Sequence, residues 1–433
     1  MSYTAIVTKI QVRSHPNADK LQLGNCQGNQ VVVGLDTVDG AVGIYFDTDG
    51  ELSHDYCVNN NLYNNSALQR LNLPLSDHPG FFDHKRRVRA QSFRGSKSEG
   101  IWLPLSSLSW AGNIDLLKEG DTLTEFGGHE ICQKYISPAT RRALGQQNQV
   151  KTGRRELKQF PKHDVTKQLR FVINDIPEDA VIYITEKCHG TQGRYCNVLD
   201  EELLPKWKQL LNTYLFRRGF FQPTSTYKHF NGSKNVILER SDSRTSWYGT
   251  DDFRYNVTKD LQLRKGEVIY FEIVGWVNET SPIMPPHQVD KKSLPEVYKQ
   301  FGDVINYSYS CPAGEHRMYV YKIMLMNEDG HGVDLSWPQV KQRCTELGLA
   351  HVPELHRLML HEVDEHGSTL GATVAQFVEG PSTLNPNQIR EGVIVRVESS
   401  LGTLYLKQKS HDFCVLEGII KSDDTFIDPE DLS

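Results

Sequence analysis

Short apolar runs separated by polar turn residues dominate the first third of the chain. Residues 5–12 alternate in part between apolar and polar positions, and further apolar runs lie at 21–23, 30–33 and 42–46. Asp, Asn and Gly residues occupy the intervals between these runs, as is typical of turns between strands. Many short strands of this kind indicate a small β-barrel. We therefore predict a mostly β domain over residues 1–135.

Strands and helices are mixed in the pattern from residue 171 onward. Strands are predicted by short apolar runs at 171–173, 181–184, 266–275, 318–323, 390–396 and 404–409. Helices are predicted by apolar residues at helical spacing in 201–218, 338–347 and 372–378. The sequence therefore predicts a second, α+β domain over residues 171–433.

Positive charge is concentrated between the two predicted domains, although the whole chain has a formal net charge of −6. Residues 137–170 contain nine Lys or Arg and two acids. Because this stretch is polar and lacks apolar periodicity, we interpret residues 136–170 as a basic linker. A second basic cluster lies at 84–89, with Arg94 nearby. Such stretches are either solvated surface or points of contact with a phosphate backbone, and the sequence leaves both interpretations open.

The cysteines and the apolar runs indicate the compartment. The eight cysteines are scattered and include no C-x-x-C pair, which argues against a zinc site and a disulfide framework and fits free thiols in a reducing cytoplasm. No apolar run approaches the ~20 residues of a membrane helix, and the N-terminus has no signal-peptide pattern. We expect a cytoplasmic protein without a membrane partner.

A K-x-x-G pattern, Lys187-Cys188-His189-Gly190, follows the apolar run at 181–184. Lys187 is thus expected at the mouth of a buried strand, with Gly190 allowing a ligand to approach the backbone. The pattern alone is a weak signal, because most lysines are solvated surface residues.

Four later strands carry charged or aromatic residues within apolar runs. These are Glu272 in 266–275, Tyr321 in 318–323, Glu391 in 390–396, and Lys407 and Lys409 in 404–409. The two lysines share one face of their strand at period two. Acids seldom lie in such strands unless they are paired or functional. Taken singly, each residue also has an ordinary structural explanation as an ion-pair partner, a core aromatic or the wet face of an edge strand.

Taken together and in order, the segments KCHG, FEIVG, YVYKI, EGVIVR and LKQK resemble the motifs of the covalent nucleotidyltransferases. That superfamily comprises ATP-dependent DNA ligases, RNA ligases and mRNA capping enzymes. A histidine two residues after the lysine resembles the RNA-ligase branch. Only 24 of the 433 residues follow Lys409, too few for the barrel that follows the last motif in capping enzymes and most DNA ligases.

Residues 14–24, SHPNADKLQLG, resemble part of the OB-type barrels that bind RNA in several tRNA-handling proteins. An OB-like domain before the catalytic domain resembles one group of RNA ligases. The resemblance thus implies an α+β fold in which an N-terminal OB-like β-barrel precedes a nucleotidyltransferase (ligase adenylation) domain with antiparallel sheets and flanking helices.

The resemblance also implies the chemistry, with ATP and Mg²⁺ or Mn²⁺ as cofactors. Lys187 would attack the α-phosphate of ATP and form lysyl-AMP, for which it must be neutral. Burial and the nearby Lys407 and Lys409 would disfavour its protonated form. These two lysines would also hold the α-phosphate and stabilise its developing charge.

Further roles follow from the same resemblance. Glu272 and Glu391 would hold the metal directly or through water, with ribose binding as an alternative for Glu272. Tyr321 would stack on adenine, and Glu186 would contact the base edge. His189 occupies a position that is an acid in some relatives, which suggests phosphate or nick contact here instead.

The second motif of the family, which usually places an Arg near the ribose, is less distinct in this chain. Lys234 is our preferred candidate, and Arg240 and Arg244 remain open. Its distance in sequence from Lys187 is long, because the predicted helix at 201–218 is inserted between them.

The resemblance therefore implies an ATP-dependent RNA ligase that joins 3′-OH and 5′-phosphate ends, at nicks in a duplex or at broken RNA ends, during RNA repair. RNA would be held by the N-terminal domain and the basic linker, and no obligate protein partner is evident. One alternative is a DNA or hybrid nick ligase, which differs in the strand it seals. The other is a non-catalytic RNA-binding protein, which would form no covalent adenylate.

Overall fold

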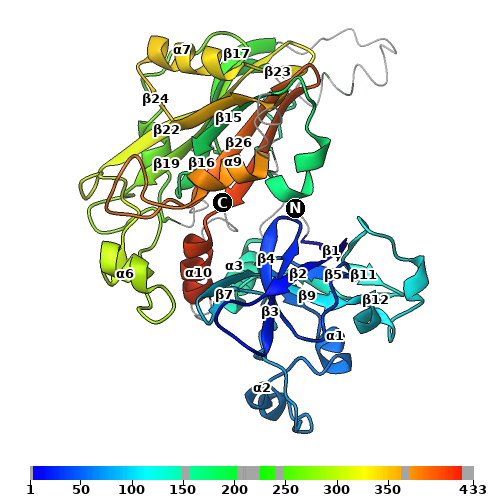
Figure 1. Cartoon of the computed structure of the whole chain (residues 1–433). Helices are drawn as coiled ribbons and strands as arrows, with labels where there is room; N and C mark the ends of the chain where they lie inside the picture. Colours follow the sequence, from blue (N-terminus) through cyan, green and yellow to red (C-terminus); the bar gives the residue numbers. More distant parts are fainter. Residues whose placement is uncertain are drawn as a thin grey trace.

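The computed structural model describes residues 3–148, 156–164, 166–201, 208, 210, 225–238, 248–361 and 370–421. The architecture is α+β, with sheets predominating and short helices at their margins (Figure 1). The N-terminal strands gather in one part of the molecule and the later strands in another, with helix α10 (His411–Ile420) beside the N-terminal part (Figure 1). Within the described ranges, no helix is long and apolar enough to cross a membrane.

The N-terminal part consists of small antiparallel sheets. One sheet contains, in spatial order, β10 (Thr122–Leu123), β1 (Ala5–Lys9), β5 (Val42–Phe46) and β9 (Ile101–Pro104). Another contains β2 (Gln11–Ser14), β3 (Leu21–Cys26) and β4 (Asn29–Gly34). Three two-stranded pairs are β6 (Gly50–Leu52) with β13 (Cys132–Lys134), β7 (Ala90–Phe93) with β8 (Ser96–Glu99), and β11 (Glu125–Phe126) with β12 (His129–Glu130). Two short helices, α1 (His54–Asn59) and α2 (Asn65–Arg70), lie between β6 and β7 in sequence.

Strand β5 explains how this part is packed. Successive side chains of a strand point to opposite faces, so Tyr45 and Phe46 enter different cores, one with Trp102 and the other with Tyr56. The strands predicted from the sequence are confirmed, although the run at 5–12 is divided into β1 and β2 at the fully buried Ile10. The ladders of residues 3–134 do not join these strands into one closed barrel.

The predicted basic linker contains more structure than its polarity suggested. Helix α3 (Pro138–Asn148) begins after Ser137, whose Oγ accepts a hydrogen bond from Thr140 N at 3.1 Å, and Pro138 occupies the first helical position. Strand β14 (Lys167–Gln168) then pairs in parallel with β27 (Gly402–Lys409). The predicted strand at 171–173 is wrong. Two 3₁₀ turns, Leu169–Phe171 and Ile173–Asp175, occupy this run, because the consecutive Val172 and Ile173 both pack against a core, whereas Phe171 is exposed.

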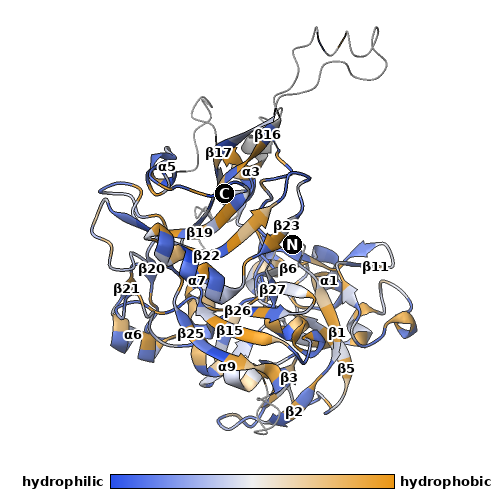
Figure 2. Ribbon diagram, turned by 90° about the horizontal axis from the view of Figure 1, so that it is seen from above, coloured by the Kyte–Doolittle hydropathy of each residue, from blue (hydrophilic) through white to orange (hydrophobic). Residues whose placement is uncertain are grey.

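Two larger sheets are built mainly from the predicted catalytic domain, and we call them the first and second catalytic sheets. The first has the order β14-β27-β26-β15-β25. It includes β15 (Val181–Glu186), β26 (Gly392–Ser399) and β25 (Glu354–Met359). Valine and isoleucine side chains of β15 and β26 are fully buried and pack with helix α9 (Leu370–Val378). These central strands carry long hydrophobic stretches in Figure 2, as expected for strands covered on one face and flanked on both edges.

The second catalytic sheet has the order β18-β17-β16-β19-β22-β23, with β24 also paired to β22. Its strands are β16 (Thr191–Glu201), β17 (Ser225–Ser233), β18 (Ile237–Leu238), β19 (Glu267–Gly275), β22 (His316–Met326), β23 (Gly332–Asp334) and β24 (Ala350–His351). Around it lie α5 (Asp252–Asn256), α6 (Pro295–Phe301), α7 (Trp337–Leu347) and the pair β20 (His287–Gln288) and β21 (Val304–Ile305). The helices predicted at 338–347 and 372–378 are confirmed as α7 and α9. The helix predicted at 201–218 falls almost entirely outside the described residues, and Glu201 ends β16.

Helix α10 joins the two parts of the molecule. Arg87 Nη1 donates to the Gly418 carbonyl at 3.1 Å, and the Tyr135 hydroxyl donates to the Lys421 carbonyl at 3.3 Å. His411 Nδ1 lies 3.0 Å from Glu99 Oε1. The N-terminal part is therefore fixed directly to the helix that follows the two lysines of β27.

Candidate active site

Lys187 lies in the turn between β15 and β16. Its backbone N–H donates to the Gly392 carbonyl at 3.0 Å, and the His189 N–H donates to the Tyr309 hydroxyl at 2.6 Å. Gly190 is required by close packing, because a Cβ there would lie 2.3 Å from the Ile273 carbonyl oxygen. The turn is thus held against both sheets, which fixes the origin of the Lys187 side chain.

A cavity of about 910 Å³ opens at this turn, between the N-terminal part and the catalytic sheets. Six of the site residues predicted from the sequence border it: Lys187, Gly190, Lys234, Glu272, Lys407 and Lys409. Further cations enter from other parts of the chain, namely Lys134, Lys167, Arg170 and Lys421. A cavity with so many cations attracts polyanionic ligands such as nucleotides and nucleic acids.

The Glu391 carboxylate is the anion at the centre of these cations. It is 0% exposed, and its Oε2 lies 2.7 Å from Lys187 Nζ while its Oε1 lies 3.5 Å from Lys409 Nζ. His189 Nδ1 lies 3.5 Å from Oε2. Burial would raise the pKa of Glu391, but the Lys187 and Lys409 ammonium groups lower it to about 2. Glu391 is therefore a carboxylate at neutral pH, in direct contact with the predicted nucleophile.

This contact differs from the expected surroundings of Lys187. The sequence suggested that burial and cations surround the amine, whereas its nearest charged partner is an anion. An ion pair at this distance favours the ammonium form. The proton must therefore leave Lys187 before the amine can attack an electrophile.

Gly392 directly follows Glu391 and fixes the backbone at the start of β26. Its φ is +144°, and a Cβ there would lie 2.3 Å from the Gln408 carbonyl oxygen. Only glycine fits this position without displacing β27. The Glu391-Gly392 pair thus places a carboxylate where β26 and β27 meet.

Lys409 has a second anionic partner in α10. The two carboxylate oxygens of Glu417 lie 3.0 and 2.9 Å from Lys409 Nζ. Glu417 also pairs with Lys421 at 3.0 Å. Lys409 is therefore held between Glu391 and Glu417, and the helix that follows β27 sets its position.

Four of the predicted site residues that the structure describes do not border the cavity: Glu186, His189, Tyr321 and Glu391. The Glu186 carboxylate is buried and accepts hydrogen bonds from the Ser382 hydroxyl and from Thr383 N, the latter at 2.8 Å. Tyr321 is hydrogen-bonded through its hydroxyl to His163 Nδ1. The side chains of Glu186 and Tyr321 thus both have protein partners.

Of the three candidates for the second motif, only Lys234 lies within the described residues. Lys234 borders the cavity, directly after β17. Arg240 and Arg244 lie outside the described residues. Arg194, which the sequence did not single out, is 1% exposed and donates from Nε to the Ser233 carbonyl at 3.0 Å. It supports the strand end that carries Lys234.

The sequence analysis missed several other residues of the site. His163 and Gln192 border the cavity, and His163 Nε2 and Gln192 Oε1 are buried with no hydrogen-bond partner among the described residues. Arg254, itself buried, donates to Thr191 Oγ1 and to the Gln192 carbonyl, each at 2.7 Å. No local sequence pattern marks Arg254, and His163 is part of a segment interpreted only as a basic linker.

The basic cluster at 84–89 has mainly internal partners. Arg87 lies 2.8 Å from Asp49, and Arg86 pairs with Glu51. Both arginine side chains are largely covered, with 20% and 4% exposed for Arg86 and Arg87. These two residues stabilise the N-terminal part and its contact with α10, which neither of the two sequence interpretations included.

The carboxylates of the site suit a metal ion that is also bound by the phosphates of a nucleotide. Across the parts of the chain that the structure describes, no three His, Cys, Asp or Glu side chains converge on one point. Glu272 borders the cavity, and Glu391 lies beside Lys187. One or two carboxylates with substrate phosphates and water form a typical Mg²⁺ site, so this pair fits such an ion.

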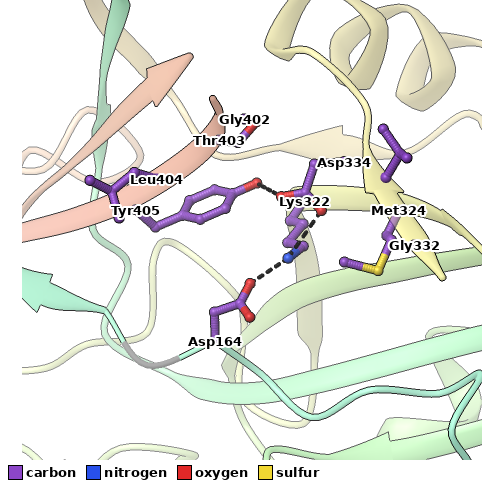
Figure 3. Close-up of a pocket in the computed structure, with 10 residues that line it drawn as sticks. Asp164, Lys322, Met324, Gly332, Asp334, Gly402, Thr403, Leu404 and Tyr405 are labelled. Carbon is purple, nitrogen blue, oxygen red and sulfur yellow. Dashed lines mark hydrogen bonds and ion pairs between the residues drawn. The ribbon is translucent and has the colours of Figure 1, made fainter. Parts of the chain in front are cut away.

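A second cavity of about 630 Å³ lies where β22 and β23 meet β27 (Figure 3). Lys322 Nζ pairs with Asp164 and, at 3.1 Å, with Asp334, to which the Tyr405 hydroxyl donates at 3.0 Å (Figure 3). Asp164 borders both cavities. Its ion pair with Lys322 fixes the segment that carries His163 to the second catalytic sheet.

Comparisons with known proteins agree with this fold and site. The sequence model of the RNA ligase family matches residues 180–412, more than half of the chain. A mutant of Naegleria gruberi RNA ligase in its apo form has a TM-score of 0.55 at 15% identity, covering 96% of this chain and 98% of that chain. Another mutant of that ligase, solved with ATP and Mn, has a TM-score of 0.52 at 16% identity, covering 94% and 97%. The same ligase with pyrophosphate has a TM-score of 0.54 at 15% identity, covering 95% and 97%.

At these identities the similarity to solved structures establishes a shared fold. No curated protein matched the sequence.

Proposed function

The chain belongs to the RNA ligase family, and on that premise we propose that it is an ATP-dependent enzyme that joins 3′-OH and 5′-phosphate ends of RNA at nicks. The observation that carries this proposal is the position of Lys187 at the cavity, in contact with Glu391 and beside Lys407 and Lys409. The structures of Naegleria gruberi RNA ligase with ATP and Mn and with pyrophosphate support a nucleotide ligand.

In the first step, the neutral Lys187 amine attacks the α-phosphorus of ATP. A P–N bond forms, the P–O bond to pyrophosphate breaks, and pyrophosphate leaves. Lys407 and Lys409 stabilise the charge that develops on the α-phosphate oxygens. The amine loses its proton through Glu391, which is already in contact with it, or to water in the cavity.

Glu272 and Glu391 would hold Mg²⁺ or Mn²⁺ together with phosphate oxygens, and the ion would offset the negative charge of the phosphates. Tyr321 would stack on adenine through its ring while its hydroxyl keeps the hydrogen bond to His163, and Lys234 would bind near the ribose. Glu186, which is hydrogen-bonded to Ser382 and Thr383, would contact the edge of the adenine base.

The two later steps transfer AMP and then displace it. An oxygen of the RNA 5′-phosphate attacks the lysyl-AMP phosphorus, the P–N bond breaks, and adenylated RNA forms. The 3′-OH then attacks the 5′-phosphate, a phosphodiester forms, and AMP leaves. Both steps require the two ends in line, and His189 is proposed to contact the phosphate or the nick.

We assign RNA binding to the N-terminal, OB-like domain at 1–135 and to the basic linker at 136–170, with adenylation in residues 171–433. Lys134, Lys167 and Arg170 border the cavity from the first two of these regions, so the RNA backbone would reach Lys187 along them. All eight cysteines are free thiols, which fits RNA repair in a reducing compartment such as the cytoplasm.

The test is covalent labelling with [α-³²P]ATP and Mg²⁺ or Mn²⁺, followed by denaturing electrophoresis. Wild type should retain label, and Lys187→Ala should lose it entirely because the P–N bond cannot form. Lys299→Ala, an exposed lysine of α6 away from the cavity, should label like wild type. Absence of label in wild type, or equal labelling of Lys187→Ala, would leave the non-catalytic RNA-binding alternative. Sealing of nicks with either RNA or DNA on the 3′-OH side then separates RNA from DNA or hybrid ligation.

A further inference from the structure

His163 is held rigidly beside the cavity by aromatic neighbours. Its Nδ1 is hydrogen-bonded to the Tyr321 hydroxyl, and its ring meets Tyr270 edge to face at 5.2 Å between centroids. The Tyr270 hydroxyl in turn donates to the Pro161 carbonyl at 2.9 Å. The segment that bears His163 is therefore attached to β19 and β22 at several points.

The proton of the imidazole can be assigned from these contacts. Burial, and after it the nearby cations led by Arg194 and Lys234, lower the pKa of His163 well below its usual value, so the ring is neutral. Burial raises the pKa of the Tyr321 hydroxyl, which keeps its proton. Because the Tyr321 hydroxyl has no other hydrogen-bond partner among the described residues, we assign it as the donor to Nδ1 and the single ring proton to Nε2.

That Nε2–H group lacks an acceptor. Nε2 is buried and has no hydrogen-bond partner among the residues that the structure describes, although His163 borders the cavity beside Lys187. Buried donors are nearly always paired in native proteins, and an unpaired one requires an explanation. Gln192, which borders the same cavity, has an acceptor, Oε1, that is buried and has no partner among the described residues. A donor and an acceptor that both lack partners indicate a missing ligand with hydrogen-bonding groups of both kinds.

We propose that His163 contacts the substrate nucleotide, donating a hydrogen bond from Nε2 to an acceptor on the adenosine unit, either a ring nitrogen of the base or a ribose hydroxyl. This inference rests on the proposed function, because it takes ATP as the ligand of the cavity. The adenosine unit is favoured over the phosphates because Tyr321, the predicted stacking residue, is the group that orients His163. The segment between the two parts of the molecule would thereby contribute to ATP recognition.

The experiment compares two substitutions by initial rates of Lys187 labelling over a range of ATP concentrations. His163→Phe keeps a ring but removes the donor, and it should raise KM for ATP by roughly tenfold, the usual effect of one lost hydrogen bond. The maximal rate should change much less. His163→Gln places an amide N–H near the position of Nε2 and should restore most of the affinity. Thermal unfolding of both variants shows whether they are folded.

Analogues of ATP separate ligand contact from a structural role and base from sugar. Wild type should bind one of 1-deaza-, 3-deaza-, 7-deaza- or 2′-deoxy-ATP more weakly than ATP, and this penalty should disappear in folded His163→Phe. The inference is overturned if folded His163→Phe has the KM of wild type, or if it retains every analogue penalty. In either case wild type still takes up label at Lys187, whereas failure of the proposed function would leave wild type unlabelled.

Discussion

Glu391 has two tasks at the scale of single residues. It forms an ion pair with Lys187, and under the proposed function it would also hold the metal. A ligand that brings a metal ion would draw the carboxylate charge away from Lys187. If the proposed function holds, the event that supplies the electrophile would therefore also release the Lys187 amine.

Glu391→Gln tests this arrangement through activity. The amide keeps the shape of the side chain but removes its charge, its metal affinity and its ability to take the amine proton. We expect Lys187 labelling to slow by at least about 100-fold, comparable with removal of one preorganised charge-stabilising group. Rapid-quench measurement of label uptake at saturating ATP checks this, and an unchanged maximal rate would show that Glu391 has no part in the step.

The same variant makes a prediction about pH and stability. The folded pKa of Glu391 is lowered to about 2, below the ~4.3 of a free glutamate. The ionised carboxylate therefore contributes stability above pH ~4.3, and this contribution is lost as the pH falls toward 2. At neutral pH, Glu391→Gln should be less stable by on the order of 2 kcal/mol. Urea unfolding at several pH values should show the two proteins converging between pH 4 and 2, and a constant difference would contradict this.

At the scale of elements, the catalytic strands could be predicted because their patterns are local. The runs now seen as β15, β19, β26 and β27 are largely apolar, and several of the predicted site residues lie in them or directly beside them. Helix α3 was missed because its residues are mainly polar, and only the Ser137-Pro138 start marked it. The run at 171–173 was predicted as a strand although it packs as turns, since an apolar run of three residues does not specify its backbone geometry.

Helix α10 contributes Glu417, whose side chain fixes the position of Lys409. Glu417 holds Lys409 Nζ with both oxygens, so Glu417→Gln should let the lysine move toward Glu391. We expect the maximal rate of labelling to fall roughly tenfold, with a smaller change in KM for ATP. Asp412→Asn, in the first turn of the same helix and away from the cavity, is the matched control. Equal rates in Glu417→Gln and the control would show that Lys409 is positioned by other contacts.

At the scale of the whole molecule, the cavity could not be predicted from the sequence. Its border combines β1, the linker, both catalytic sheets and the end of α10. Arg170 pairs with Asp47 across the two parts, a contact between residues that no motif relates. His163 became a site residue only when the fold brought its segment to the cavity at Lys187. Lys187, Lys407 and Lys409 could be predicted from local sequence patterns, whereas most other residues of the border could be identified only from the complete fold.

The same border leads to a prediction about RNA. Lys134 comes from the N-terminal part and Lys167 from the linker, and both border the cavity. If they contact RNA phosphates, Lys134→Ala and Lys167→Ala should each weaken RNA binding equally for all sequences. Each should also reduce the slope of log affinity against log salt by ~0.7 to 0.9, as expected for loss of one phosphate contact.

Nick sealing at limiting RNA should then fall more than Lys187 labelling does, because the first step needs no RNA. Lys20→Ala, an exposed lysine of the N-terminal part that does not border the cavity, controls for a general loss of positive charge. Fluorescence anisotropy with nicked RNA between 50 and 300 mM salt measures the slopes. An unchanged slope in both cavity variants, with sealing as in Lys20→Ala, would place the path of the RNA away from this border.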